Sequence, residues 1–120
     1  MKRDMDIIRA ILLQVNNHEK ATVPEVKLED FDTEQVAYHV NLLAEAGYIT
    51  GVPSQSVLDD VPEWIEVRLT WDGHEFIDAA RNETIWAKFK EVIVEKGGTV
   101  PFSLAVNILT AVTKQHFGLP

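Results

Sequence analysis

His74 and Glu75 are the neighbours in this chain whose types first suggest catalysis, because an imidazole beside a carboxylate can act as a general base. They lie in "RLTWDGHEFIDAAR", where a run of β-type residues meets Thr70 and a helix is expected to begin. A general base needs a partner within hydrogen-bond reach, and a metal site needs at least three ligands. No histidine lies three or four residues from another; the others are His18, His39 and His116. The pattern therefore favours a structural joint, with Thr70 as helix cap and Gly73 letting the first turn lie close to the sheet.

A group of carboxylates is the second candidate, because such oxygens can hold a hard cation. The group consists of Asp59, Asp60, Glu63 and Glu66. Its spacing lacks the glycine turn and the regular ligand positions of a calcium loop. The pattern favours a solvated acidic segment, and an acidic patch for a basic protein partner stays open as the functional alternative.

The composition excludes several classes of protein. The chain has no cysteine, which excludes disulfides, thiolate catalysis and cysteine-ligated metals. No apolar run reaches the length of a bilayer, and acids interrupt the basic start of the chain, unlike in a signal peptide. A chain of 120 residues is long enough for one domain with a real core. We expect a soluble, cytoplasmic protein without a cofactor.

The net charge of −8 is unevenly distributed along the chain. Residues 51–80 contain one Lys/Arg against seven Asp/Glu, whereas residues 81–120 contain five against three. An acidic protein is repelled by phosphate backbones, so the charge weighs against nucleic-acid binding.

Apolar periodicity and capping residues predict the helices. They are expected over residues 4–18, residues 33–46 and residues 71–81, then from Asn82 or Thr84 to the glycine pair at 97–98, and from Pro101 to about His116.

Alternation predicts three strands. A short edge strand is expected around Pro24, and "YITGV" and "WIEVRLT" are expected to form an antiparallel hairpin. The intervening "PSQSVLDDVPE" is expected to be a long acidic loop bounded by prolines. In the second hairpin strand, Trp64, Glu66 and Arg68 are expected on one face, opposite Ile65, Val67 and Leu69.

The order helix, edge strand, helix, hairpin, helix is typical of a winged helix. Residues 19–32 leave little room for the usual second helix, and Pro24 argues against one. We therefore expect an α/β fold, mostly α: a winged helix-turn-helix-like domain with a β-hairpin wing and additional C-terminal helices. Residues 1–81 would form the core, and residues 82–120 a helical extension packed on it, giving one domain overall.

Three segments, "MKRDMDIIRAILL", "VAYHVNLLAEAGYI" and "RLTWDGHEFIDAARNETIW", resemble a bacterial and phage family with a domain of unknown function. The layout is similar to that of small YjcQ-type winged-helix proteins. The resemblance covers most of the chain in the same order. It implies a winged-helix-like fold, and it implies neither an activity nor catalytic residues.

The helix over residues 33–46 is where a winged helix would read DNA, and Gln35 and Asn41 could read adenine. However, this helix contains no Lys or Arg and contains two glutamates, the reverse of the basic stripe of a DNA-binding domain. A protein partner is therefore favoured over DNA. The candidate interaction surface is Glu34, Gln35, Tyr38, His39, Asn41, Asp59, Asp60 and Glu63.

We therefore expect a non-enzymatic regulatory or protein-interaction module of bacterial or phage origin, with a DNA-binding transcriptional regulator as the alternative. The alternative would be favoured by a spatial cluster of Lys2, Arg3, Lys88, Lys90 and Lys96. An enzyme would need a deep pocket around His74 or His39. The expected partner is another protein or a second copy, as a homodimer through the C-terminal helices. Core packing is the default role for those helices, and a homodimer interface is the alternative.

Overall fold

The computed structural model describes residues 1–58 and 60–120, which form two compact units, Met1–Ile77 and Asp78–Pro120. The first unit contains α1 (Met5–Asn17), β1 (Val23–Glu25), α2 (Thr33–Glu45), β2 (Ile49–Leu58) and β3 (Val61–Leu69). Helix α3 (Trp71–Ala80) runs into the second unit, which contains α4 (Glu83–Glu95) and α5 (Phe102–His116). A mixed α/β fold that is mostly helical is thereby confirmed.

Helices α1 and α2 are each capped at the N-terminus by an aspartate. The carboxylate of Asp4 accepts the backbone N–H groups of Asp6 and Ile7, and that of Asp32 accepts the N–H of Gln35. Such caps satisfy donors that have no partner within the helix. Each helix then buries one apolar stripe, consisting of Ile7, Ile8, Ile11, Leu12 and Val15 on α1 and of Val36, Val40 and Leu43 on α2.

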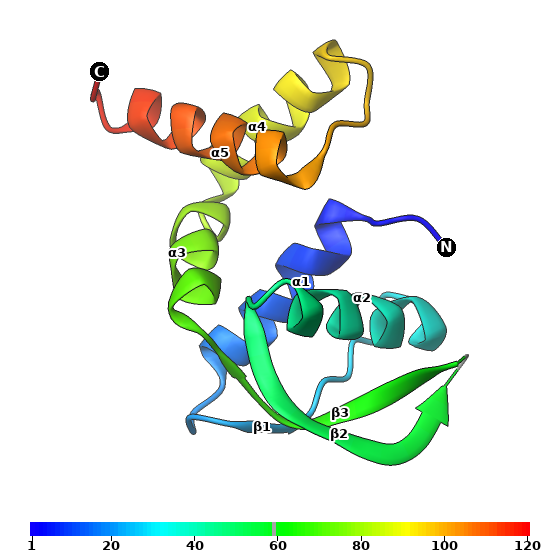
Figure 1. Cartoon of the computed structure of the whole chain (residues 1–120). Helices are drawn as coiled ribbons and strands as arrows, with labels where there is room; N and C mark the ends of the chain where they lie inside the picture. The colour runs from blue at the N-terminus through cyan, green and yellow to red at the C-terminus, as the bar shows by residue number, and fades with distance from the viewer. Residues whose placement is uncertain (59) are drawn as a thin grey trace. The chain divides into compact units, whose positions relative to one another are not determined.

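The three strands form an antiparallel sheet in the order β1-β3-β2. Helices α1 and α2 lie on the same side of this sheet, and both contact β3 (Figure 1). Val23 of β1 pairs with Val67 of β3, and both side chains are buried. Pro24 lies in β1 at the edge of the sheet, as expected, because proline cannot donate to a second neighbour.

The hairpin is longer than the sequence pattern predicts. Strand β2 extends to Leu58 and strand β3 begins at Val61, so most of the expected loop is strand. Pro53 lies within β2 and Pro62 within β3. Proline is tolerated here because β2 is an edge strand and because Pro62 lies beyond Ile65, the last residue of β3 that pairs with β1. The register also shifts between Pro53 and Val57.

A β-bulge at Glu66 changes the face of β3 on which Trp64 lies. Thr50 pairs with Arg68 and Val52 with Ile65, so Gly51 lies opposite two residues of β3. Glu66 takes up the extra residue with a φ of 50°. A Cβ at Gly51 would lie 2.8 Å from the carbonyl oxygen of Ile65, which explains the glycine. Beyond the bulge, Trp64 faces α2, and its expected position on the face of Glu66 and Arg68 is wrong.

Thr70 and Gly73 form the expected joint between β3 and α3. The hydroxyl of Thr70 accepts the N–H of Gly73 at 3.1 Å and donates to the carbonyl of Gly47 at 2.6 Å. The backbone N–H of Thr70 donates to the carbonyl of Tyr48 at 3.1 Å. A Cβ on Gly73 would overlap that same carbonyl oxygen. The close approach predicted for Gly73 is confirmed.

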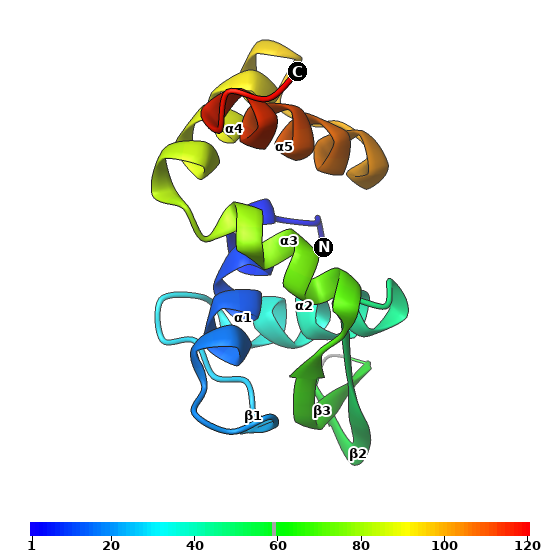
Figure 2. The same cartoon turned by 90° about the vertical axis from the view of Figure 1, so that its left-hand side faces the viewer.

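The second unit is a helical hairpin in which α4 and α5 pack side by side (Figure 2). Asn82 caps α4 by accepting the N–H of Ile85 at 3.0 Å. The buried side chains are Ile85, Trp86 and Phe89 of α4 and Ala105, Leu109 and Val112 of α5. Leu104 is 50% exposed and does not belong to this buried set. Across both described ranges, no helix combines the length and the apolar character needed to cross a bilayer.

Candidate functional site

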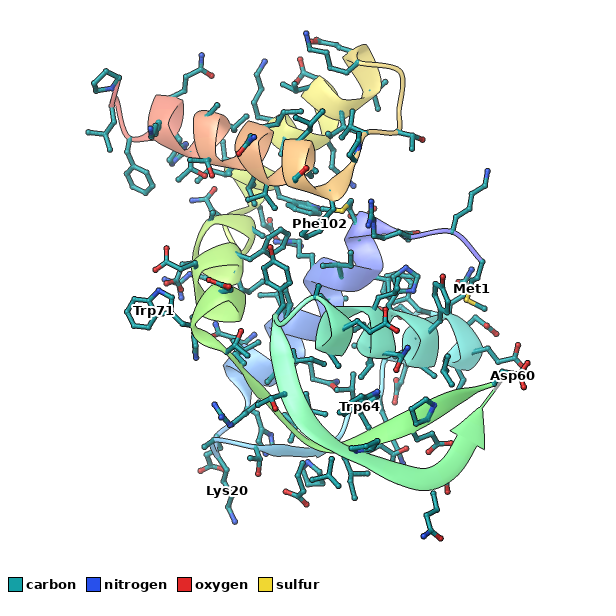
Figure 3. The ribbon with its side chains drawn as sticks, viewed as in Figure 1. Met1, Lys20, Asp60, Trp64, Trp71 and Phe102 are labelled. Atoms are coloured by element: carbon teal, nitrogen blue, oxygen red, sulfur yellow. The ribbon has the colours of Figure 1, made fainter. Side chains whose placement is uncertain are left out.

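A groove of about 410 Å³ lies in the first unit, between α2, β3 and the segment that joins β1 to α2. Figure 3 shows Trp64 between the hairpin and α2, on the groove's wall. The groove is lined by residues 25–29, Phe31, Thr33, Val36, Ala37, Val40, Glu63 and Trp64. Most of these side chains are apolar, as is usual for sites that bind another molecule.

The wall formed by residues 26–31 has no regular secondary structure, and Gln14 of α1 holds it in place. The side-chain oxygen of Gln14 accepts the backbone N–H of Lys27 at 3.0 Å, and its amide nitrogen donates to the backbone carbonyl of Lys27. One side chain thereby satisfies both backbone groups of Lys27, as a neighbouring strand would. The groove is therefore bounded by a fixed segment.

The opposite wall is set by a hydrogen bond between the hairpin and α2. The indole N–H of Trp64 donates to the side-chain oxygen of Asn41 at 3.1 Å. The amide nitrogen of Asn41 donates in turn to the carboxylate of Glu45 at 3.3 Å. Trp64 is half-buried, so part of its ring stays open to a ligand. A large aromatic surface in a fixed orientation is typical of binding hot spots.

The rim of the groove is acidic. Glu25, Glu29 and Glu63 supply three carboxylates, against the single ammonium of Lys27. Lys27 lies 3.8 Å from Glu25, and both side chains are largely exposed. Such an exposed pair contributes little to stability. The arrangement suits an apolar group flanked by positive charges.

Several residues of the predicted interaction surface adjoin this groove. Glu63 lines it, and Asn41 orients Trp64. Glu34 and Gln35 are exposed in the first turn of α2, and Tyr38 is half-buried beside His39. Asp60 is exposed at the hairpin tip, where it turns the chain with a φ of 67°. Asp59 lies outside the described residues.

His39 does not belong to the interaction surface, and this prediction is wrong. Its side chain is fully buried. Nε2 accepts the backbone N–H of Asp4 at 2.8 Å, and Nδ1 donates to the carbonyl of Gln35 at 2.6 Å. The imidazole therefore joins the start of α1 to α2. Helical spacing alone placed it outward, because a contact with the N-terminal segment leaves no local signal.

His74 is exposed, in the first turn of α3, and it lines a second hollow of about 260 Å³. His18 lines the same hollow, although 56 positions separate the two histidines. The remaining lining residues are Val15, Asn16, Lys20, Ala21, Arg68 and Leu69. Sequence spacing could not reveal this cluster, because its members come from segments far apart in the chain. Among the residues that the structure describes, no group of three or more His, Asp or Glu is arranged to hold a metal ion.

The sequence pattern missed Trp64 as a site residue because regular alternation turned it away from α2. The bulge at Glu66 changes that alternation. A signal was present in Gly51, because an isolated glycine inside a strand pattern is typical of a bulge. The wall at residues 26–31 carries no comparable signal.

Comparison with known proteins identifies relatives of this chain. The family described as "Hypothetical protein (DUF2513)" matches residues 2–99. A protein of Haemophilus influenzae described as "Uncharacterized protein" is 38% identical over 99 residues, which cover 80% of this chain and 81% of that protein. No solved structure matches the chain. The chain therefore belongs to the DUF2513 family, which confirms the expected membership in a family of unknown function.

Proposed function

We propose that this DUF2513 protein is a non-enzymatic, cytosolic protein-interaction module whose groove binds an extended segment of a protein partner. The segment would carry a large apolar side chain flanked by Lys or Arg. One observation carries the proposal: Trp64, held by Asn41, forms a fixed wall of an apolar groove whose rim bears three carboxylates.

The module is proposed to be of the winged-helix type, with β2 and β3 as the wing. The order α1, β1, α2, β2, β3 supports this, as does the three-stranded antiparallel sheet. The segment between α1 and α2 departs from the standard module, because β1 stands there and no helix does. In this chain that segment supplies one wall of the groove.

The energetics favour an apolar anchor over a purely charged contact. Burying a large apolar side chain stabilises a complex by roughly 1.5–3 kcal/mol. Exposed charge pairs contribute about 0–1 kcal/mol each, but they steer encounter and select the partner. We therefore assign affinity to Trp64 and the apolar lining, and selectivity for a basic segment to Glu25, Glu29 and Glu63.

A transcriptional regulator that reads DNA is the weaker candidate. Glu34 and Gln35 are exposed where a winged helix would meet the bases, and α2 has no Lys or Arg. Of the cations that would favour this alternative, Lys2 and Arg3 belong to the first unit and Lys88, Lys90 and Lys96 to the second. The acidic hairpin would also be repelled by phosphates.

The experiment is a titration of the ¹⁵N-labelled intact chain with short synthetic peptides, followed by two-dimensional NMR. The panel places one Leu, Phe or Trp among lysines, among serines or among glutamates. We expect saturable shifts at Trp64, Ala37 and Val40, with the lysine-flanked peptides binding tightest. Raising the salt concentration should reduce the difference in affinity between the lysine-flanked peptides and the others. The preference for a large apolar side chain should not change.

Trp64→Ala tests the site, and Trp71→Ala is its matched control, because Trp71 is 79% exposed and does not line the groove. Figure 3 shows Trp71 projecting from α3 away from the ribbon. We expect Trp64→Ala to weaken peptide binding about tenfold or more, equivalent to roughly 1.4 kcal/mol, and Trp71→Ala to leave it unchanged. Equal loss in both variants, or shifts confined to other surfaces, would overturn the proposal.

A further inference from the structure

The second hollow, at the end of α1 and the start of α3, is a different feature from the groove and has a different chemistry. We propose that it binds an anion, specifically the dianionic phosphate group of a phosphate monoester. The proposal does not depend on the groove or on its peptide ligand. It follows from the residues that converge on the hollow, from the absence of acids among them, and from its small volume.

Four nitrogen-bearing side chains of basic character line the hollow, and they come from three segments of the chain. His18 follows α1, Lys20 lies in the turn before β1, Arg68 lies on β3 and His74 on α3. The amide of Asn16 is a further possible donor. Among the described residues that line the hollow there is no carboxylate, although the chain contains 19 Asp and Glu against 11 Lys and Arg. A site with this bias is unusual on a chain whose net charge is −8.

The cationic groups at the hollow are not neutralised by neighbours. Neither Lys20 nor Arg68 forms an ion pair with any residue that the structure describes. Glu66, two positions before Arg68, accepts a hydrogen bond from the hydroxyl of Thr22 at 3.1 Å and does not line the hollow. Glu75 adjoins His74 in the sequence and is likewise absent from the lining. The guanidinium and the ammonium are therefore available to an external anion.

The backbone around the hollow is held in place by the fold. Arg68 pairs with Thr50 in the sheet, and the next residue, Leu69, is buried. The N–H of His74 bonds to the carbonyl of Thr70 at 3.0 Å, and the N–H of His18 bonds to that of Val15 at 3.3 Å. The side chains of His18, Arg68 and His74 thus start from fixed points, so a ligand needs to order mainly the side chains themselves.

A phosphate monoester fits this set of donors better than other anions. A guanidinium can donate two parallel hydrogen bonds to two phosphate oxygens, and lysine adds a point charge. Each imidazole can donate a further hydrogen bond. A hollow of about 260 Å³ suits a single compact anionic group rather than a nucleic-acid backbone. Val15, Ala21 and Leu69 add an apolar surface that an ester's organic part could contact.

The test uses the intact ¹⁵N-labelled chain at constant ionic strength and pH, titrated separately with inorganic phosphate, phenyl phosphate, a phosphoserine peptide and sodium sulfate. We expect saturable shifts at Lys20, Arg68 and His74, with a phosphate ester binding more tightly than sulfate. Tighter binding of phenyl phosphate would indicate a phosphorylated small molecule as the natural source. Tighter binding of the peptide would indicate a phosphorylated protein.

Arg68→Gln should weaken phosphate binding about tenfold or more, and Arg68→Lys should restore part of it, because the charge returns without the paired donors. Lys20→Gln, on the exposed turn, is a second variant that leaves the sheet intact. Lys114→Gln, exposed on α5, is the matched control and should have no effect. The proposal is overturned if shifts do not saturate, if sulfate and phosphate esters bind alike, or if Lys114→Gln weakens binding as much as Arg68→Gln and Lys20→Gln do.

Discussion

Nε2 of His39 accepts the backbone N–H of Asp4 at 2.8 Å, across 35 positions of the sequence. The same Asp4 caps α1 with its carboxylate, so one residue both starts the first helix and fastens it to α2. Because Nε2 accepts, the ring proton is on Nδ1, where it meets the carbonyl of Gln35 at 2.6 Å. His39 is therefore a buried structural cross-link in the first unit.

Replacing His39 with Leu should lower the free energy of unfolding by about 1–3 kcal/mol, because the N–H of Asp4 loses its acceptor. Urea denaturation measures the change. His116→Leu, at an exposed histidine of α5, should stay within about 0.5 kcal/mol of wild type. Imidazole ¹⁵N shifts should also show the proton of His39 on Nδ1. Equal midpoints for the two variants, or a proton on Nε2, would contradict this role.

Gly73→Ala should be destabilising, although alanine in place of a helical glycine ordinarily stabilises by roughly 0.5–1 kcal/mol. The added methyl would overlap the carbonyl oxygen of Tyr48, which also accepts the N–H of Thr70. Relieving that overlap must move the β3–α3 joint, at a cost of about 1–3 kcal/mol. Thermal or urea denaturation gives the sign directly. A stabilised Gly73→Ala variant would show that the joint is not tightly packed.

Local signals in the sequence predicted the elements well, since caps, apolar periodicity and the Thr70–Gly73 joint each depend on residues close in the chain. Long-range contacts account for the errors. The hydrogen bond between His39 and Asp4 and the hollow that His18 and His74 both line join segments that no local pattern relates. The bulge at Glu66 has both a local signal and a long-range cause. Gly51 indicates the bulge in the sequence, but its effect on Trp64 follows only from the pairing of β2 with β3.

The phenol of Tyr48 should resist ionisation. Burial raises its pKa above the ordinary 10.0, and the carboxylate of Asp72 raises it further. Burial and the carboxylate disfavour the charged phenolate in the folded chain. As the pH rises, the phenol of the unfolded chain therefore loses its proton at a lower pH than that of the folded chain. The stabilisation is therefore complete below pH 10 and is lost as the pH rises from there through the folded pKa.

The stability of wild type should accordingly fall more steeply above pH 10 than that of Tyr48→Phe, which has no phenol to ionise. Urea denaturation at several alkaline pH values measures this difference. Asp72→Asn should lower the pKa of Tyr48, as followed by near-ultraviolet absorbance. Parallel stability curves for wild type and Tyr48→Phe would contradict the assignment.

Duplex DNA should bind this chain weakly. Helix α2 carries no cation, and Asp60 and Glu63 lie at the outer end of the hairpin, so few phosphates can be neutralised. Affinity for a random duplex should therefore be weaker than the usual ~10⁻⁴–10⁻⁶ M at physiological salt. Fluorescence anisotropy with a labelled duplex measures it. Micromolar binding with a steep salt dependence would instead favour the transcriptional regulator.

The second unit should mediate self-association, because it exposes large apolar side chains. Val94 of α4 is 72% exposed, and Leu104 of α5 is 50% exposed. Phe117, the residue that follows α5, is 66% exposed. Leaving such side chains in water forgoes roughly 1.5–3 kcal/mol each. Residues 81–120 carry five Lys/Arg against three Asp/Glu, whereas residues 1–80 carry six against sixteen. Opposite charges on the two parts would help one copy dock on another.

Sedimentation equilibrium of the intact chain should therefore show dimers at concentrations on the order of tens of micromolar. Phe117→Ser should shift the equilibrium toward monomer, because it removes a largely exposed aromatic side chain without touching the buried residues of α5. Trp71→Ala removes an exposed aromatic from the first unit and should leave the dimer unchanged. Added salt should weaken the dimer if the charges contribute. A strictly monomeric wild type at these concentrations would mean that the exposed side chains of α4 and α5 do not mediate self-association.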